Sequence, residues 1–178
     1  MDRTVSNQTP ELFHADSALH ERILAGHLAI LAQVDYFREN FGSAESRWKK
    51  DGTRVTIVDE TISRELFILL EKDFPSDDYC SEEEAETPEP IPTEAEFCWI
   101  LDPVDGTNNY AVGVPECCIS LGLLRHGIPV YGFIYDYGRD NLLQGGKEFG
   151  SIEGTTPVFA ATELVNEKLT YCMHFPIP

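Results

Sequence analysis

Two carboxylates lie three positions apart at the end of an apolar segment. Asp102 follows residues 97–101, and Pro103 and Val104 separate it from Asp105. Pro103 fixes one backbone dihedral, so a bend at this point can turn Asp102, the Val104 carbonyl and Asp105 toward one place. Carboxylate and carbonyl oxygens are the hard ligands that Mg²⁺ prefers. The segment therefore predicts a magnesium site.

The residues that follow Asp105 predict an anion site beside this metal site. Gly106 and Thr107 begin a new element, and the first N–H groups of a helix are unpaired and carry partial positive charge. Such groups bind phosphate. Asp-Pro and Asp-Gly are also common turn dipeptides, so the alternative is a strand end followed by a plain loop. Average residue usage gives Asp-Pro-any-Asp-Gly-Thr at only about one in two million positions, which favours the site.

The composition is that of one globular domain with a strong negative charge. The 178 residues include 31 Asp and Glu against 13 Lys and Arg, a formal net charge of −18. Nucleic acids and anionic membranes would be repelled, whereas divalent cations would be attracted. Five cysteines, an odd number, fit a reducing compartment, and residues 1–19 lack the apolar stretch of a signal peptide or membrane span. We therefore expect a cytoplasmic protein with neither a nucleic acid nor a membrane as its partner.

The first half of the chain predicts two helices. Residues 1–16 are polar and are expected to form a flexible lead-in. Apolar residues recur at steps of three and four from 17 to 41 and from 59 to 72, which is typical of helices with one buried face. The predicted buried residues are Leu19, Ile23, Leu24, Leu28, Leu31, Val34 and Phe37 in the first helix, and Ile62, Leu66, Leu69 and Leu70 in the second.

The second half predicts strands. Residues 81–96 are rich in glutamate and proline, so their middle is expected to be a solvated loop. The pattern beyond them is extended and the connections are short, which implies antiparallel neighbours. Two helices followed by such strands predict an α+β fold rather than a doubly wound parallel sheet. The predicted strands are 97–101, 117–124, 130–137 and 142–143, with a further one beginning at 169–175.

The segment from Asp102 to Tyr110 resembles the first signature of the inositol monophosphatase superfamily. That pattern is Asp-Pro-any-Asp-Gly-Thr-any-Asn-aromatic, and all nine positions fit. The order of Val55-Thr56, Asp59 and Glu82-Glu83 ahead of it is also similar. The resemblance covers residues 17–178 and implies the N-terminal domain of an αβαβα layered phosphatase, with two helices packed on an antiparallel sheet and a possible homodimer.

The resemblance also implies which residues bind metal. Carried over position by position, it makes Glu82, Asp102, the Val104 carbonyl and Asp105 ligands of two or three Mg²⁺ ions. Ser81 departs from the family, which usually has glycine there. Glu82 also has a plainer interpretation, because it belongs to a run of glutamates, and charge runs are usually solvated.

The remaining roles concern water and phosphate. The resemblance implies that Asp59 and Thr107 position and activate a water, that Glu83 is a neighbouring carboxylate, and that Gly106, Thr107 and Asn108 bind phosphate. Metal-bound water would attack phosphorus in line, a second metal would stabilise the leaving alkoxide, and no covalent intermediate would form. Asp59 could equally be a helix N-terminal residue favoured by the dipole.

The second signature of the family, Trp-Asp-any-Ala, is absent. Trp48 and Trp99 are followed by Lys49 and Ile100, so we expect the C-terminal α/β domain and its metal aspartate to be missing. The expected substrate is a small phosphate monoester such as inositol 1-phosphate. Fructose-1,6-bisphosphatase, histidinol phosphatase or 3'-phosphoadenosine 5'-phosphate phosphatase activity remains open. So does a catalytically inactive, half-length metal- or phosphate-binding or regulatory protein.

Two other site types fit the motif less well. In haloacid-dehalogenase-type phosphatases one residue separates the two aspartates, whereas two separate Asp102 from Asp105, and Pro103 would stand where the nucleophile belongs. An EF-hand with Gly106 at its sixth position would place Leu101 and Val112 at ligand positions, where neither can bind Ca²⁺.

Overall fold

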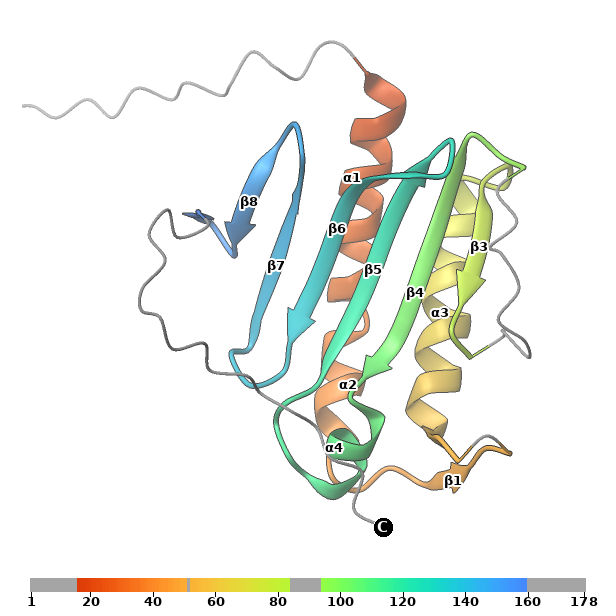
Figure 1. Cartoon of the computed structure of the whole chain (residues 1–178), viewed down its shortest axis with the longest axis vertical. Helices are drawn as coiled ribbons and strands as arrows, with labels where there is room; N and C mark the ends of the chain where they lie inside the picture. The colour runs from red at the N-terminus through yellow and green to blue at the C-terminus, as the bar shows by residue number, and fades with distance from the viewer. Residues whose placement is uncertain (1–15, 51, 84–93, 160–178) are drawn as a thin grey trace, which may run out of the picture.

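Three helices cover one face of a seven-stranded sheet in the computed structural model, which describes residues 16–50, 52–83 and 94–159 (Figure 1). The helices are α1 (Ser17–Leu31), α2 (Val34–Glu39) and α3 (Ile57–Asp73). A fourth, α4 (Thr107–Val112), lies at the end of the sheet. The layering is that of an α+β fold, as the sequence predicts.

The strands of the seven-stranded sheet lie side by side in the order in which they occur in the chain. Its order is β3-β4-β5-β6-β7-β8-β9, and every neighbouring pair is antiparallel except β3 and β4, which are parallel. The strands are β3 (Asp78–Ser81), β4 (Phe97–Asp105), β5 (Cys118–Arg125), β6 (Ile128–Asp136), β7 (Asn141–Gly146), β8 (Gly150–Glu153) and β9 (Thr156–Val158).

The four predicted strands that lie within the described residues are present, and β4 and β7 are longer than predicted. The sequence analysis missed β3, β8, β9 and the separate hairpin of β1 (Ser46–Trp48) and β2 (Arg54–Thr56), since these strands are only three or four residues long. The parallel β3 also corrects the expectation of a wholly antiparallel sheet. The middle of the predicted loop 81–96, the predicted strand at 169–175 and most of the lead-in lie outside the described residues.

The predicted first helix is two helices with a different buried face. The chain turns at residues 32 and 33 between α1 and α2. Leu24, Leu28 and Leu31 were predicted to be buried, yet they are 60%, 57% and 45% exposed. The reason is Gly26, where an added Cβ would lie 2.8–2.9 Å from core ring atoms, so α1 approaches the sheet on its side of small residues. The buried residues of α1 are Leu19, Gly26, Ala29 and Ile30.

Helix α3 agrees better with its prediction. Ile62, Leu66 and Leu70 are buried, but Leu69 is 43% exposed and Phe67 is buried in its place. The helix begins two residues earlier than predicted, because Thr56 caps it.

A buried charged cluster joins the helices to the sheet. Arg22 of α1 donates from Nε and Nη2 to the two carboxylate oxygens of Asp77, at 2.8 and 2.7 Å. Trp99 of β4 donates from Nε1 to the same carboxylate at 3.0 Å. The guanidinium stacks over the rings of Phe74 and Phe97, at 4.4 and 4.0 Å from their centroids. The cluster thereby fixes α1 and the residue before β3 against β4. None of the described helices combines the length and apolar character needed to cross a membrane.

Candidate metal and phosphate site

A β-bulge brings Asp102 and Asp105 to the same side of strand β4. Side chains alternate along a regular strand, so two residues three positions apart face opposite ways. Here Asp102 pairs with Ser120 and Asp105 with Cys118, which sets three steps on β4 against two on β5. The extra residue restores the common direction. The shift lies where the sequence predicts a bend at Pro103.

The parallel strand β3 delivers Glu82 beside Asp102. Ser81 pairs with Leu101, and the Glu82 N–H donates to the Leu101 carbonyl at 3.0 Å, so Glu82 continues β3 next to the end of β4. Burial raises the pKa of Asp102 well above its usual range. A hydrogen bond with Glu82 and the negative charges of Glu82 and Asp105 raise it further. Two carboxyl groups this close favour either a shared proton or a cation.

Asp59 is buried at the start of α3. Its Oδ2 accepts from the Thr56 N–H at 2.8 Å and from the Thr56 hydroxyl at 2.5 Å, which completes a capping box. The Thr107 hydroxyl lies 3.2 Å from Asp59 Oδ1 and 2.9 Å from the Val104 carbonyl oxygen, and it can donate to either. Burial raises the pKa of Asp59 to about 6. The helix-capping and site interpretations of Asp59 thus coexist.

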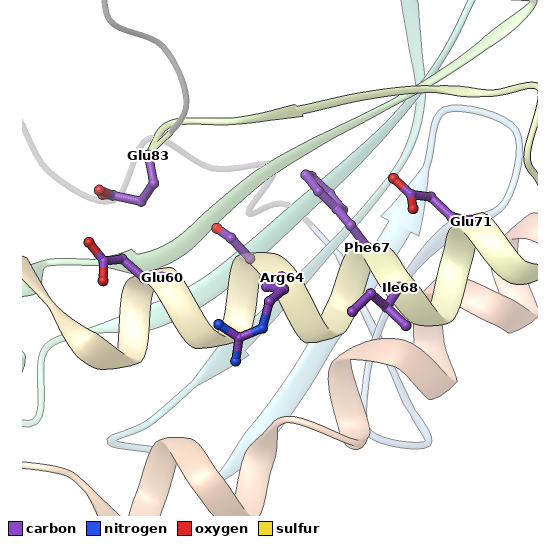
Figure 2. Close-up of a pocket in the computed structure, with 7 residues that line it drawn as sticks. Glu60, Arg64, Phe67, Ile68, Glu71 and Glu83 are labelled. Carbon is purple, nitrogen blue, oxygen red and sulfur yellow. The ribbon is translucent and has the colours of Figure 1, made fainter.

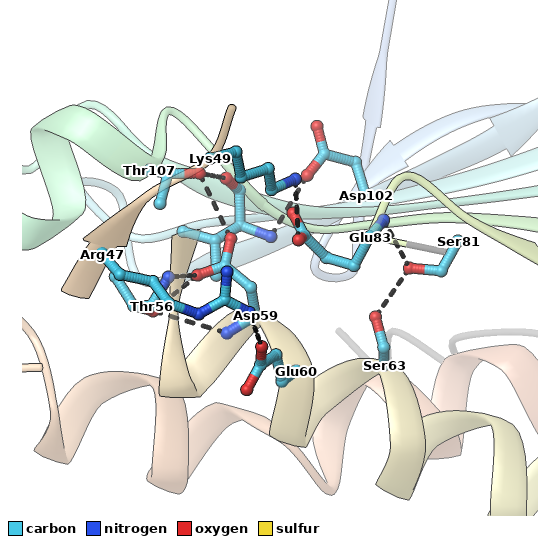
Figure 3. A network of polar contacts seen from close by, with 11 residues as sticks. Arg47, Lys49, Thr56, Asp59, Glu60, Ser63, Ser81, Glu83, Asp102 and Thr107 are labelled. Atoms are coloured by element: carbon cyan, nitrogen blue, oxygen red, sulfur yellow. Dashed lines mark hydrogen bonds and ion pairs between the residues drawn. The ribbon is translucent and has the colours of Figure 1, made fainter. Parts of the chain in front are cut away.

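Glu83 makes two contacts that fix its position, one through its side chain and one through its backbone N–H. The Lys49 ammonium lies 2.8 Å from Glu83 Oε2, and the two side chains are 24% and 11% exposed. The Glu83 N–H donates to the Ser81 hydroxyl at 3.3 Å, and Ser81 is 2.7 Å from the hydroxyl of Ser63 on α3. Both serines are buried. The serine that replaces the usual glycine therefore ties the glutamate pair to α3 (Figure 3).

Gly106 allows the turn into α4. Its φ is +85°, and an added Cβ would lie 2.8 Å from the Glu116 carbonyl oxygen, so a side chain would be strained and would clash. The helix is anchored by Tyr110, whose hydroxyl donates to the Phe37 carbonyl at 2.6 Å and whose ring stacks on that of Phe37. These contacts fix the first turn of α4 relative to β4.

Five of the nine predicted site residues line a cleft of about 930 Å³. The residues from the predicted site that line it are Glu82, Asp105, Gly106, Thr107 and Asn108, and Lys49 and Arg54 of the hairpin line it too. A smaller hollow of about 350 Å³ runs along α3, with Glu60, Arg64, Phe67 and Glu71 on one side and Glu83 on the other (Figure 2). The motif residues belong to the larger cleft, so we place the site there.

The family model of the inositol monophosphatase family matches residues 20–174. This chain belongs to that family. Inositol monophosphatase 1 of Solanum lycopersicum is 35% identical over 117 residues, 65% of this chain and 43% of that protein. Fructose-1,6-bisphosphatase/inositol-1-monophosphatase of Aquifex aeolicus is 32% identical over 129 residues, 70% of this chain and 47% of that protein. The chain thus spans less than half the length of these relatives.

A solved structure of the inositol monophosphatase family shares the fold. The structure titled as an IMPase/NADP phosphatase complexed with Mg²⁺ and phosphate matches with a TM-score of 0.62 and 26% sequence identity, covering 75% of this chain and 51% of that one. That structure contains a divalent metal and phosphate.

In this chain, five of the predicted site residues form two groups. Asp102, Glu82 and Asp105 are brought together at the ends of β3 and β4, and Asp59 and Thr107 meet at the starts of α3 and α4. Over residues 16–50, 52–83 and 94–159, no three His, Cys, Asp or Glu side chains are arranged as a ready metal cage. Like charges repel, so carboxylates of one site separate or take other partners.

The two cysteines of the site remain thiols. Burial raises the pKa of Cys117 and of Cys118 to about 12, so neither forms the thiolate that a nucleophile needs. Cys118 lies 3.7 Å from Asp105 Oδ2. Both environments therefore favour packing over reaction at these two cysteines. The sequence analysis missed Lys49, because no local pattern indicates that a hairpin lysine reaches Glu83.

Proposed function

We propose that this chain provides the metal- and phosphate-binding half of a Mg²⁺-dependent phosphomonoesterase that acts on a small phosphate monoester such as inositol 1-phosphate. The observation that carries the proposal is the β4 bulge, which sets Asp102 and Asp105 on one side, next to Glu82 from β3. Carboxylates that crowd together at a cleft suit a hard divalent cation. Membership of the inositol monophosphatase family supports the same reaction class.

The first proposed role of the site residues is metal binding. Glu82, Asp102, Asp105 and the Val104 carbonyl would hold Mg²⁺, whose positive charge would act on the phosphate oxygens and on an attacking water. The Val104 carbonyl oxygen lies 2.9 Å from the Thr107 hydroxyl and has two lone pairs, so it can bind a metal whether or not Thr107 donates to it.

Asp59 and Thr107 would orient the attacking water. The Thr107 hydroxyl contacts both the Asp59 carboxyl and the Val104 carbonyl, so it lies between the buried carboxyl and the metal ligands. A carboxyl with a pKa of about 6 is matched to accepting a proton near neutral pH, through the Thr107 hydroxyl. Phosphate would bind at Gly106, Thr107 and Asn108, where the first turn of α4 lines the cleft.

Phosphate release tests the proposal. The full chain is assayed with inositol 1-phosphate, fructose 1,6-bisphosphate, histidinol phosphate and 3'-phosphoadenosine 5'-phosphate, with Mg²⁺ and with a chelator. Asp102→Asn should lower kcat/KM by about 100-fold or more, since it removes a charged metal ligand. Glu153→Gln, an acidic residue of β8, is the matched control and should retain activity. Turnover that survives both the chelator and Asp102→Asn would contradict the mechanism.

A second function is metal and phosphate binding without turnover. One observation favours it: the carboxylates among the described residues do not form a complete metal cage. Calorimetry with Mn²⁺ distinguishes the two functions. Metal binding that Asp102→Asn abolishes, without phosphatase activity toward any of the four substrates, would support the binding protein.

A further inference from the structure

Lys49 reaches from the β1–β2 hairpin into the carboxylates of the proposed metal site. The hairpin turn is tight, because the Lys49 N–H donates to the Thr53 carbonyl at 2.7 Å and the Gly52 N–H donates to the Lys49 carbonyl at 3.1 Å. The ammonium group contacts Glu83 at 2.8 Å. Figure 3 shows the side chain of Lys49 directed toward both Glu83 and Asp102. The hairpin therefore places a positive charge on Glu83, the residue next to the predicted metal ligand Glu82.

The Lys49–Glu83 pair is shielded from water more than a typical surface pair. Its side chains are 24% and 11% exposed, whereas those of the neighbouring pair Arg47–Glu60 are 65% and 42% exposed. Coulomb attraction strengthens as water is excluded, so the ammonium is held more firmly than on an open surface. The negative charge of Glu83 also contributes to the raised pKa of Asp59, so Glu83 is close enough to influence this site residue electrostatically.

We propose that Lys49 is a built-in competitor of the divalent cation: its ammonium neutralises Glu83 and the adjoining carboxylates, and metal binding requires that it move away. The inference rests on the metal site of the proposed function. An ammonium group and a divalent cation carry like charges, so a metal ion held by Glu82 and Asp102 would repel the ammonium that is bound to the adjacent Glu83. Lys49 thus lowers metal affinity and sets the concentration at which the site fills.

The tip of the hairpin is the part that can move, because Val55 and Thr56 of β2 are buried and Thr56 caps α3. Strands β1 and β2 form a sheet of their own, and all three residues of β1 are exposed. Loss of the Lys49–Glu83 contact would release the tip of the hairpin, while the Arg47–Glu60 pair holds its base. Trp48 is next to Lys49, is 62% exposed and stacks with the Arg54 guanidinium at 4.6 Å from its ring centroid. Its fluorescence should report the movement.

The first experiment compares metal affinity. Mn²⁺ is titrated calorimetrically into the metal-stripped full chain at fixed pH and ionic strength, for the unaltered protein and for Lys49→Met and Lys50→Met. Lys50 is exposed and adjacent, so its variant removes the same charge without removing the contact. Lys49→Met should bind Mn²⁺ about five- to tenfold more tightly, the change expected for losing one partly buried ion pair. Lys50→Met should change the Kd by less than about twofold, because exposed charges are screened.

The possible outcomes separate this inference from the proposed function. Equal Kd values in all three chains, or equal gains in both variants, would overturn the competitor role and leave the metal site intact. Weaker binding by Lys49→Met would also overturn it, since Lys49 would then assist the metal. Binding by none of the three chains would overturn the metal site and this inference together.

The second experiment follows the hairpin. Mn²⁺ is replaced by Mg²⁺, which does not quench fluorescence by itself, and emission at each concentration is measured with and without Trp48→Phe. The difference isolates Trp48 from Trp99, which is fully buried in β4. The Trp48 signal should change with the same midpoint as metal binding, and the change should be absent in Lys49→Met. A Trp48 signal that stays constant while the metal binds would contradict the displacement.

Discussion

Asp59 shows how one carboxyl serves both a helix and the proposed chemistry. It is buried at the third position of α3, where the N–H and hydroxyl of Thr56 donate to one oxygen and the hydroxyl of Thr107 contacts the other. Burial outweighs these hydrogen bonds and raises the pKa of Asp59 to about 6. The protonation of this residue therefore changes within the range where proteins are commonly studied.

The stability of the metal-stripped chain should depend on pH through Asp59. In the unfolded chain this carboxyl ionises near its model value of 3.8, and in the folded chain near 6. Between these values the folded chain binds more protons, so the free energy of unfolding should fall as pH rises from about 4 to about 6.5. The expected decrease is about 1–3 kcal/mol. Urea unfolding in a chelating buffer measures it.

Asp59→Asn is the matched variant for this experiment. The variant cannot ionise at position 59, so its stability should fall less steeply over the same pH range. Asp102, whose pKa is raised as well, contributes a decrease that remains in the variant. Parallel curves for the variant and the unaltered chain would show that Asp59 is not the titrating group.

For individual residues, the sequence predicts which residues belong to the candidate site better than it predicts the contacts that they make. The string from Asp102 to Tyr110 is rare enough to indicate a site by itself. The Lys49–Glu83 contact could not be predicted, because it joins two loops 34 positions apart and depends on how the hairpin packs. The same holds for Ser63 and Ser81, which meet only because β3 runs beside α3.

Helix α1 shows why apolar periodicity alone can predict the wrong face. Its leucines repeat at helical spacing, but Gly26 and Ala29 allow a closer approach to the sheet than leucines would. An added Cβ on Gly26 would lie 2.8 Å from Phe133 Cε2 and 2.9 Å from Trp99 Cζ3. Both rings are fully buried, so neither has free space to move into.

Gly26→Ala should therefore destabilise the fold, although alanine favours helices by about 1 kcal/mol over glycine. Overpacking against the two rings should lower the free energy of unfolding by about 1–3 kcal/mol net. Urea unfolding of Gly26→Ala, Phe133→Leu and the double variant forms a thermodynamic cycle. The alanine should cost less stability when Phe133→Leu is also present than when the phenylalanine ring is retained. Additive effects would mean that the clash is not with Phe133.

Strand β3 shows a second limit at the scale of elements. Its four residues have no alternating pattern, and its parallel partner β4 begins 16 positions after it ends. Only the pairing of Ser81 with Leu101 reveals that Glu82 lies beside Asp102. The long helices and the hairpin strands β5 and β6 were predictable because local patterns specify them, whereas β3 depends on a distant neighbour.

At the scale of the whole molecule, the Arg22–Asp77 ion pair joins helix α1 to the strands that carry the candidate site. The pair links α1 to the residue before β3, and Trp99 links it to β4, the strand that carries Asp102. The side chains of Arg22 and Asp77 are 11% and 2% exposed. Removing one partner from such a pair leaves an uncompensated buried charge.

Asp77→Asn should lower the free energy of unfolding by about 3–5 kcal/mol, because the Arg22 charge would lose its counter-ion while the side chain keeps its shape. The exposed Arg47–Glu60 pair is the control, and Glu60→Gln should change stability by less than about 1 kcal/mol. Chemical denaturation of both variants measures the difference. Similar losses in the two variants would show that burial does not set the strength of these pairs.

The bulge in β4 has a consequence for how this motif tolerates insertions and deletions. Gain or loss of one residue between Asp102 and Asp105 would reverse the face of the sheet to which Asp105 points. A change of residue type at Val104 would leave that direction intact, because the carbonyl belongs to the backbone. The length of the segment is therefore constrained more tightly than its composition, and an alignment that opens a gap there would assign the wrong carboxylate to the proposed metal site.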